Sequence, residues 1–218
     1  MIKQLTHGRI QLALHTLQEG PHPRLLLLHG LGEQSPAQVP SQYKDWPGGI
    51  YALDFTGHGQ STVPRGGGYT AELLIADVDI ALAELEGATL VGRGLGAYVA
   101  TLTAGSRPEL VKGVIVLDGT GLAGGGAGSS SPYIGYPDPN LSASPDPFAI
   151  LELTTDVRPA DYCIEFVKLA MEYSGLERPI SVCSCERVPW LSEIVEESGV
   201  EVTSLDEALK HYSRAAAP

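Results

Sequence analysis

Residues 88–106 read ATLVGRGLGAYVATLTAGS, and this stretch does most to decide the fold. The short apolar run at 88–91 is typical of a strand buried on both faces, and the residues from Leu95 to Ser106 favour a helix. Gly92, Gly94 and Gly96 lie where the strand would pass into the helix. We therefore predict a sharp strand-to-helix turn centred on Gly94.

Similar apolar runs and helical patterns alternate along the rest of the chain. The runs that predict strands lie at 24–30, 49–55, 112–119, 179–185 and 199–203, and the patterns that predict helices lie at 70–86, 160–174, 189–198 and 206–217. This alternation implies right-handed βαβ units, and hence a doubly wound, mostly parallel sheet in a single α/β domain over 1–218. Residues 2–6 and 9–17 alternate polar and apolar residues, which predicts an antiparallel hairpin at one edge of the sheet.

The segment 119–147 interrupts this alternation. It holds seven Gly, five Ser and five Pro but only two charged residues. It is too poor in periodic apolar residues to predict a helix or a strand, and it follows the end of a predicted strand. Two interpretations stay open, a minimal Gly/Pro-rich lid over the carboxyl edge of the sheet and a disordered insertion.

The composition excludes several classes of partner. The 218 residues carry a net charge of −12, from 14 Lys and Arg against 26 Asp and Glu, and no stretch clusters the cations. Nucleic acids and anionic membranes demand a positive face, so we expect neither as a partner. No apolar run approaches the roughly 18–20 residues of a membrane span, and three cysteines make no disulfide framework. We expect a soluble, cytoplasmic protein, and its oligomeric state stays open.

Three motifs follow successive predicted strands, at the edge where open α/β sheets bind their ligands. They read HGLG at 29–32, DFTGHGQS at 54–61 and GRGLG at 92–96. In this order they resemble the oxyanion loop, the signature turn and the nucleophile elbow of the α/β-hydrolase superfamily. The resemblance covers nearly the whole chain, and it implies that family's fold and an esterase-like ancestry.

The sequence departs from this family at the centre of the elbow. The family places Ser, Asp or Cys there, whereas this chain has Gly94, which carries no side chain. The loop between the last strand and the last helix, where the family places its histidine, contains none, and His211 lies further along the predicted helix. Catalysis by a Ser-His-Asp triad is therefore not expected. Natural degeneration and an engineered Ser→Gly change both stay open for Gly94.

Other parts of the family's site are retained. By resemblance, the backbone N–H groups of Leu31, which follows Gly30, and of Leu95 match the two oxyanion donors, and Arg93 adds a cation beside Gly94. These five residues form the predicted ligand-binding set.

The predicted catalytic candidates are Asp118, His58 and His29. Asp118 ends one strand and Glu186 follows the next, at the two places where the family carries its acid. His29 and His58 are the imidazoles expected near the pocket, and structural hydrogen bonding is the alternative role for both.

Three weaker alternatives involve other chemistry. Cys185 ends a predicted strand and could act as a nucleophile, but a buried structural role is the default. No His pair has metal-ligand spacing, so we predict no metal. The run GRGLG lacks the G-x-G-x-x-G spacing of dinucleotide sites, so we predict no cofactor.

Three functions are compatible with this pattern. The first is a pseudoenzyme that binds a small apolar ester, lactone or carboxylate. The second is an enzyme without a nucleophile, in which water polarised by His29 or His58 and an acid such as Asp118 attacks a bound ester or lactone. The third is a catalytically dead scaffold or protein-interaction module.

Overall fold

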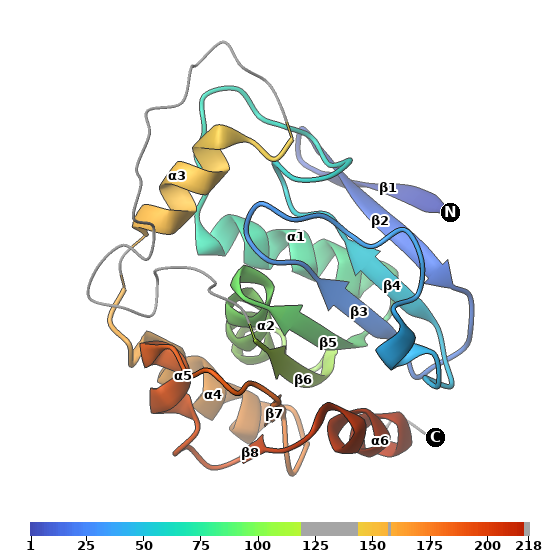
Figure 1. Cartoon of the computed structure of the whole chain (residues 1–218), viewed down its shortest axis with the longest axis vertical. Helices are drawn as coiled ribbons and strands as arrows, with labels where there is room; N and C mark the ends of the chain where they lie inside the picture. The colour runs from blue at the N-terminus through green and yellow to red at the C-terminus, as the bar shows by residue number, and fades with distance from the viewer. Residues whose placement is uncertain (119–143, 157, 216–218) are drawn as a thin grey trace.

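A computed structural model describes residues 1–118, 144–156 and 158–215, and these form an eight-stranded sheet (Figure 1). The strands are β1 (Ile2–His7), β2 (Ile10–Gln18), β3 (Leu25–Leu28), β4 (Ile50–Leu53), β5 (Ala88–Arg93), β6 (Val111–Leu117), β7 (Ile180–Val182) and β8 (Val200–Val202). Their order in the sheet is β1-β2-β4-β3-β5-β6-β7-β8. β1 pairs with β2 and β2 with β4 in antiparallel fashion, and all other pairs are parallel. The predicted doubly wound sheet and its antiparallel edge hairpin are therefore confirmed.

The helices lie close to the predicted segments, with two additions, the short η1 and α3. They are η1 (Ser41–Tyr43), α1 (Ala71–Glu84), α2 (Leu95–Ser106), α3 (Pro147–Thr155), α4 (Tyr162–Tyr173), α5 (Pro189–Ile194) and α6 (Leu205–Ala215). The structure ends α5 four residues before the predicted end at 198, after a single buried face of Trp190, Leu191 and Ile194. α6 begins one residue before the predicted start and is described to Ala215.

The central strands are apolar on both faces, because each face of the sheet is covered. Leu26 and Leu28 of β3 pack in the larger core, with α1, α2, α4 and α5. Leu25 and Leu27 point the other way and pack with Trp46, with residues around η1, and with Tyr212 of α6. The uninterrupted apolar runs of the sequence follow from this double coverage.

Helix α3 was not predicted, and it begins at the last residue of the segment 119–147. Asp146 caps it by accepting a hydrogen bond from the Phe148 N–H at 3.1 Å, and Pro147 occupies the first turn. Asp followed by Pro is a typical helix start, so this signal was present in the sequence. The lid predicted over the rest of the segment concerns residues 119–143, which lie outside the described residues.

Helix α3 packs on loops at the carboxyl edge of the sheet (Figure 1). The Asp146 N–H donates to the Gly57 carbonyl at 2.8 Å, and its carboxylate accepts from the Tyr69 hydroxyl at 2.6 Å. Glu152 accepts from the N–H groups of Gly68 and Tyr69 at 2.7 and 2.6 Å. These contacts fix the turn that follows β4 from above. None of the described helices is both long and apolar enough to cross a membrane.

Candidate functional site

The turn around Gly94 has the predicted sharp geometry. Gly94 has φ +53° and ψ −119°, a conformation that side chains adopt only under strain of about 1–3 kcal/mol and that glycine adopts freely. A Cβ on Gly92 would overlap the backbone of Gly96, and a Cβ on Gly96 would overlap the carbonyl of Leu28. The two outer glycines are thus required by backbone contact, and the central one stands where α2 begins.

Two backbone donors of this region are unpaired within the described chain. Leu95 is the first residue of α2, so its N–H has no acceptor inside the helix. In the loop after β3, the N–H groups of Gly30 and Gly32 donate to Glu33 and His58, whereas that of Leu31 meets no described acceptor. These are the two N–H groups that the sequence nominated, and a carbonyl oxygen is the group that such donors bind.

His29 and His58 tie the two neighbouring loops together by reciprocal hydrogen bonds. His29, in the loop after β3, accepts through Nε2 from the N–H of Phe55 at 3.1 Å. His58, in the turn after β4, accepts through Nε2 from the N–H of Gly32 at 3.2 Å. The Nδ1 atoms face the carbonyls of Gly30 and Thr56 at 2.8 and 3.2 Å, and since carbonyls only accept, both imidazoles carry their proton on Nδ1.

Burial keeps both histidines neutral. Burial, reinforced by the neighbouring His58, lowers the pKa of His29 to about 4. Burial likewise lowers the pKa of His58, whose side chain is completely covered. Both nitrogens of each ring are therefore engaged with the backbone, and neither ring offers a free lone pair for proton transfer.

Arg93 is paired with a residue that the sequence reasoning did not consider. The Glu33 carboxylate forms an ion pair with the Arg93 guanidinium and also accepts from the Gly30 N–H at 3.0 Å. Both side chains are exposed at the mouth of a cavity of about 160 Å³, whose walls include His29 and Leu117. The Glu33 carboxylate therefore offsets the positive charge of Arg93 beside this cavity.

Asp118 lies at the end of β6, where it holds the loop after β7. Its Oδ1 atom accepts from the Ser184 hydroxyl at 2.6 Å and from the N–H groups of Cys185 and Glu186 at 2.8 and 3.0 Å. The Ser184 hydroxyl and these N–H groups hold the pKa of Asp118 below its usual range. No described histidine contacts Asp118, so it orients no base here.

The signature turn is held by Asp54, its first residue. Burial opposes the charge of Asp54, but the N–H groups of Gln60 and Ser35 and the His15 ring outweigh it, and its pKa is lowered. The Gln60 N–H donates to Oδ2 at 2.8 Å, which closes the turn. No three His, Cys, Asp or Glu side chains of residues 1–118, 144–156 and 158–215 are placed to share a metal ion.

The structure thus brings part of the predicted set together. Gly30, Leu31, Arg93, Gly94 and Leu95 belong to one pair of adjoining loops, because β3 and β5 are neighbours in the sheet. His29 and His58 lie beside them with both nitrogens occupied, while Asp118 is engaged with the loop after β7. Sequence reasoning did not select Glu33. Its partner Arg93 lies sixty residues further along the chain, so no local sequence pattern predicts the pair.

Comparisons with known proteins point to one family. A sequence model of the alpha/beta hydrolase family matches residues 25–192. The (E)-2-((N-methylformamido)methylene)succinate hydrolase of Acinetobacter baylyi is 30% identical over 118 residues, which are 53% of this chain and 44% of that protein. An uncharacterised protein of Mycobacterium bovis is 31% identical over 110 residues, 47% of this chain and 31% of that protein. The matches span less than half the length of either relative.

Among solved structures, the crystal structure of an epoxide hydrolase from Vigna radiata is similar to part of the chain. The likeness covers 54% of this chain and 37% of that one, at 23% sequence identity and a TM-score of 0.45.

Proposed function

The chain belongs to the alpha/beta hydrolase family, and we propose that it binds a small apolar ester, lactone or carboxylate at the turn around Gly94 without using a nucleophile there. The observation that carries this proposal is the pairing of a preserved turn with a missing side chain. Gly94 holds the strained turn geometry, and the N–H groups of Leu31 and Leu95 meet no described acceptor. A carbonyl oxygen would satisfy both donors.

The Glu33–Arg93 ion pair supports a preference among the three ligand classes. The carboxylate of Glu33 already neutralises Arg93 and would repel a second carboxylate, whereas a neutral carbonyl meets no such cost. We therefore rank esters and lactones above carboxylates. The Acinetobacter baylyi relative is named as the hydrolase of a substituted succinate, which is a small carboxylate, and this keeps carboxylates among the candidate ligands.

In this proposal His29 and His58 are positioning residues. Their reciprocal hydrogen bonds hold the loop of Leu31 against the turn after β4, and this fixes the direction of the Leu31 N–H. Hydrolysis by a water molecule would need one of these rings to give up a backbone hydrogen bond. For that reason binding ranks above turnover without a nucleophile, and the scaffold function stays as the alternative without an observation of its own.

The proposal is tested first by turnover. The protein, the G94S variant and the G94A variant are compared on p-nitrophenyl acetate, butyrate and octanoate, against heat-denatured controls. G94A carries the same backbone strain as G94S but no hydroxyl. We expect no turnover by the protein or by G94A. Turnover by the protein would replace this proposal with an enzyme that works without a nucleophile.

Binding is tested separately by thermal unfolding with γ-caprolactone and with hexanoate, which have similar apolar bodies. A neutral ligand at about 100 times its dissociation constant should stabilise the fold by about 2.7 kcal/mol, a shift of several degrees in Tm. We expect a saturable shift with the lactone and a smaller one with hexanoate. If neither compound shifts the Tm of the protein, ligand binding at Gly94 is refuted.

A further inference from the structure

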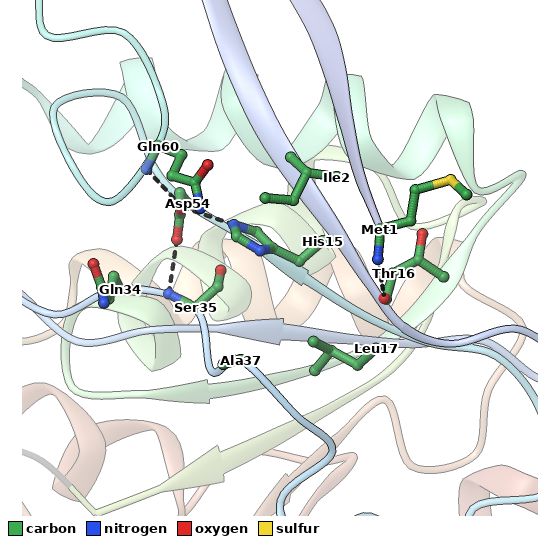
Figure 2. A pocket seen from close by; sticks show the side chains of 10 residues that line it. All are labelled: Met1, Ile2, His15, Thr16, Leu17, Gln34, Ser35, Ala37, Asp54 and Gln60. Atoms are coloured by element: carbon green, nitrogen blue, oxygen red, sulfur yellow. Dashed lines mark hydrogen bonds and ion pairs between the residues drawn. The ribbon is translucent and has the colours of Figure 1, made fainter.

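A second cavity lies at the same edge of the sheet but away from Gly94. It has a volume of about 290 Å³, close to the lower end of the range for small-molecule sites. Its walls come from β1, β2, the loop after β3 and the turn after β4 (Figure 2), and they consist of Met1, Ile2, His15, Thr16, Leu17, Gln34, Ser35, Ala37, Asp54 and Gln60. Gln34 and Ser35 also border the cavity beside Arg93, but neither Leu31 nor Gly94 lines the second one.

The chemistry of this cavity comes from a buried pair of His15 and Asp54. His15 Nε2 lies 2.8 Å from Asp54 Oδ2, and Asp54 also accepts the N–H groups of Ser35 and Gln60 at 2.7 and 2.8 Å. These donors keep Asp54 charged, so the neutral imidazole must hold its proton on Nε2. His15 Nδ1 is then a lone-pair acceptor, oriented by a carboxylate.

His15 differs from His29 and His58 in one respect. No described residue donates to or accepts from its Nδ1, and the His15 side chain is 11% exposed. This nitrogen is accessible to solvent, so it is an acceptor that a bound molecule can satisfy in place of water.

The Ser35 hydroxyl is a further unsatisfied group of this wall. It lies against Asp54 and helps to lower the pKa of that carboxyl, but it forms no hydrogen bond of normal geometry. Figure 2 shows its oxygen pointing toward the side of the His15 ring. The oxygen is covered by its neighbours, so it would reach a ligand only after a change of rotamer.

The charges of the walls select a neutral ligand. No Lys or Arg side chain lines the cavity, and the Met1 ammonium, which does line it, already donates to the Thr16 carbonyl at 3.2 Å, so a bound anion would have to compete for its one cationic partner. A cation would find only Asp54, whose oxygens already accept three N–H groups. Ile2, Leu17 and Ala37 provide apolar surface for the body of a small molecule.

We propose that this cavity is a second binding site, for a small neutral molecule with a short apolar body and a hydroxyl or other donor that hydrogen-bonds to His15 Nδ1. The site is distinct from the function proposed at Gly94, because neither His15 nor Asp54 lines the cavity beside Arg93. A ligand there would donate a hydrogen bond to Nδ1, and its apolar body would cover Ile2, Leu17 and Ala37.

The test uses four probes with related aromatic bodies. Benzyl alcohol is neutral and carries a donor, benzyl methyl ether is neutral without one, benzylamine is a cation and benzoate is an anion. Each is titrated at about pH 8, where an ordinary imidazole is neutral, while NMR follows the His15 ring signals. We expect a saturable shift with benzyl alcohol and binding about tenfold weaker with the other three.

Variants locate the binding. A37F fills the cavity from an exposed position and removes no hydrogen bond, so it should abolish the shift. H15Q, whose longer side chain places its amide near the Nε2 position, keeps a donor toward Asp54 and removes Nδ1, and it also assigns the His15 signals. G94S is the matched control and should bind benzyl alcohol as before. Equal binding of the alcohol and the ether, stronger binding of either ion, or an unchanged shift in A37F would overturn the proposal.

Discussion

The turn around Gly94 and the cavity beside His15 lie at one edge of the same sheet, but the first is defined by backbone geometry and the second by side chains. At Gly94 the backbone makes a sharp turn, and the residue carries no side chain. At His15 the side chains are present, with an imidazole oriented by a carboxylate, and the nearby N–H groups of Ser35 and Gln60 are paired with Asp54. The comparison shows that a sharp backbone turn and a set of polar side chains can occur separately in one fold.

The histidines make the same distinction within one residue type. Both ring nitrogens of His29 and of His58 are hydrogen-bonded to backbone groups, so these two residues have a structural role and connect the loops. His15 has one nitrogen bound and one without a described partner. His29 and His15 are buried to a similar degree, at 6% and 9% exposure. What distinguishes a structural histidine from one that can bind a ligand is therefore the number of ring nitrogens already hydrogen-bonded, and not burial.

The largest expected effect on stability is that of G96A. It tests whether the turn around Gly94 requires a glycine because the backbone after β3 lies so close to it. In G96A the new methyl group would overlap the Leu28 carbonyl and the His29 carbonyl oxygen, all of them backbone atoms that cannot rotate away. We expect a loss of more than about 4 kcal/mol in the free energy of unfolding, measured by chemical denaturation.

The control for G96A is G8A, in the turn between β1 and β2. Gly8 has φ +61° but no atom within 4 Å of its Cβ position, so it should lose only about 1 kcal/mol. A loss in G96A no larger than in G8A would mean that the backbone around Gly96 moves to accept the methyl group, because Gly96, unlike Gly8, has no positive φ.

The next prediction concerns His29 and pH. The pKa of His29 falls from 6.5 to about 4 on folding, so between these values the unfolded chain binds more protons than the folded one. Stability should therefore be full above about pH 6.5 and fall by about 3 kcal/mol as the pH drops to about 4, with His58 acting in the same direction.

The H29N variant isolates this contribution. Asn can still donate to the Gly30 carbonyl but leaves the Phe55 N–H without its acceptor, which should cost about 1–3 kcal/mol at neutral pH. The loss of stability between pH 6.5 and 4 should become smaller than in the unchanged protein, as measured by urea denaturation at each pH. An unchanged slope would assign the acid sensitivity to other groups.

The sequence predicted the backbone features, such as the turn around Gly94, better than the side-chain contacts. Local patterns predicted the alternation of strands and helices, the turn at Gly94 and the hairpin of β1 and β2, because periodicity and glycine spacing are local properties. Helix α3 was missed because a Gly- and Pro-rich composition outweighed the Asp146–Pro147 start signal. The partners of His29, Arg93 and His15 lie 26, 60 and 39 residues away, and only the folded chain reveals them.

The smallest expected effect concerns Glu33, and it tests whether the site at Gly94 prefers neutral ligands. In E33Q the amide oxygen can still accept from the Gly30 N–H, but the ion pair with Arg93 is lost. Because both partners are largely exposed, stability should change by less than about 1 kcal/mol. Hexanoate should bind roughly three- to tenfold more tightly, since Arg93 is released and a repelling charge is removed, while γ-caprolactone should be unaffected.

The matched control for E33Q is E84Q, which makes the same charge change in an exposed ion pair with Lys3 on another part of the surface. Hexanoate and γ-caprolactone are each titrated against the unchanged protein, E33Q and E84Q, with binding measured as a shift in Tm. The comparison separates a local effect at Glu33 from the effect of a change in net charge. If E84Q strengthens hexanoate binding as much as E33Q does, the overall charge of −12 governs anion binding. If E33Q strengthens the lactone equally, Glu33 acts as a steric barrier and not as a charge filter, and the ranking of esters and lactones over carboxylates fails.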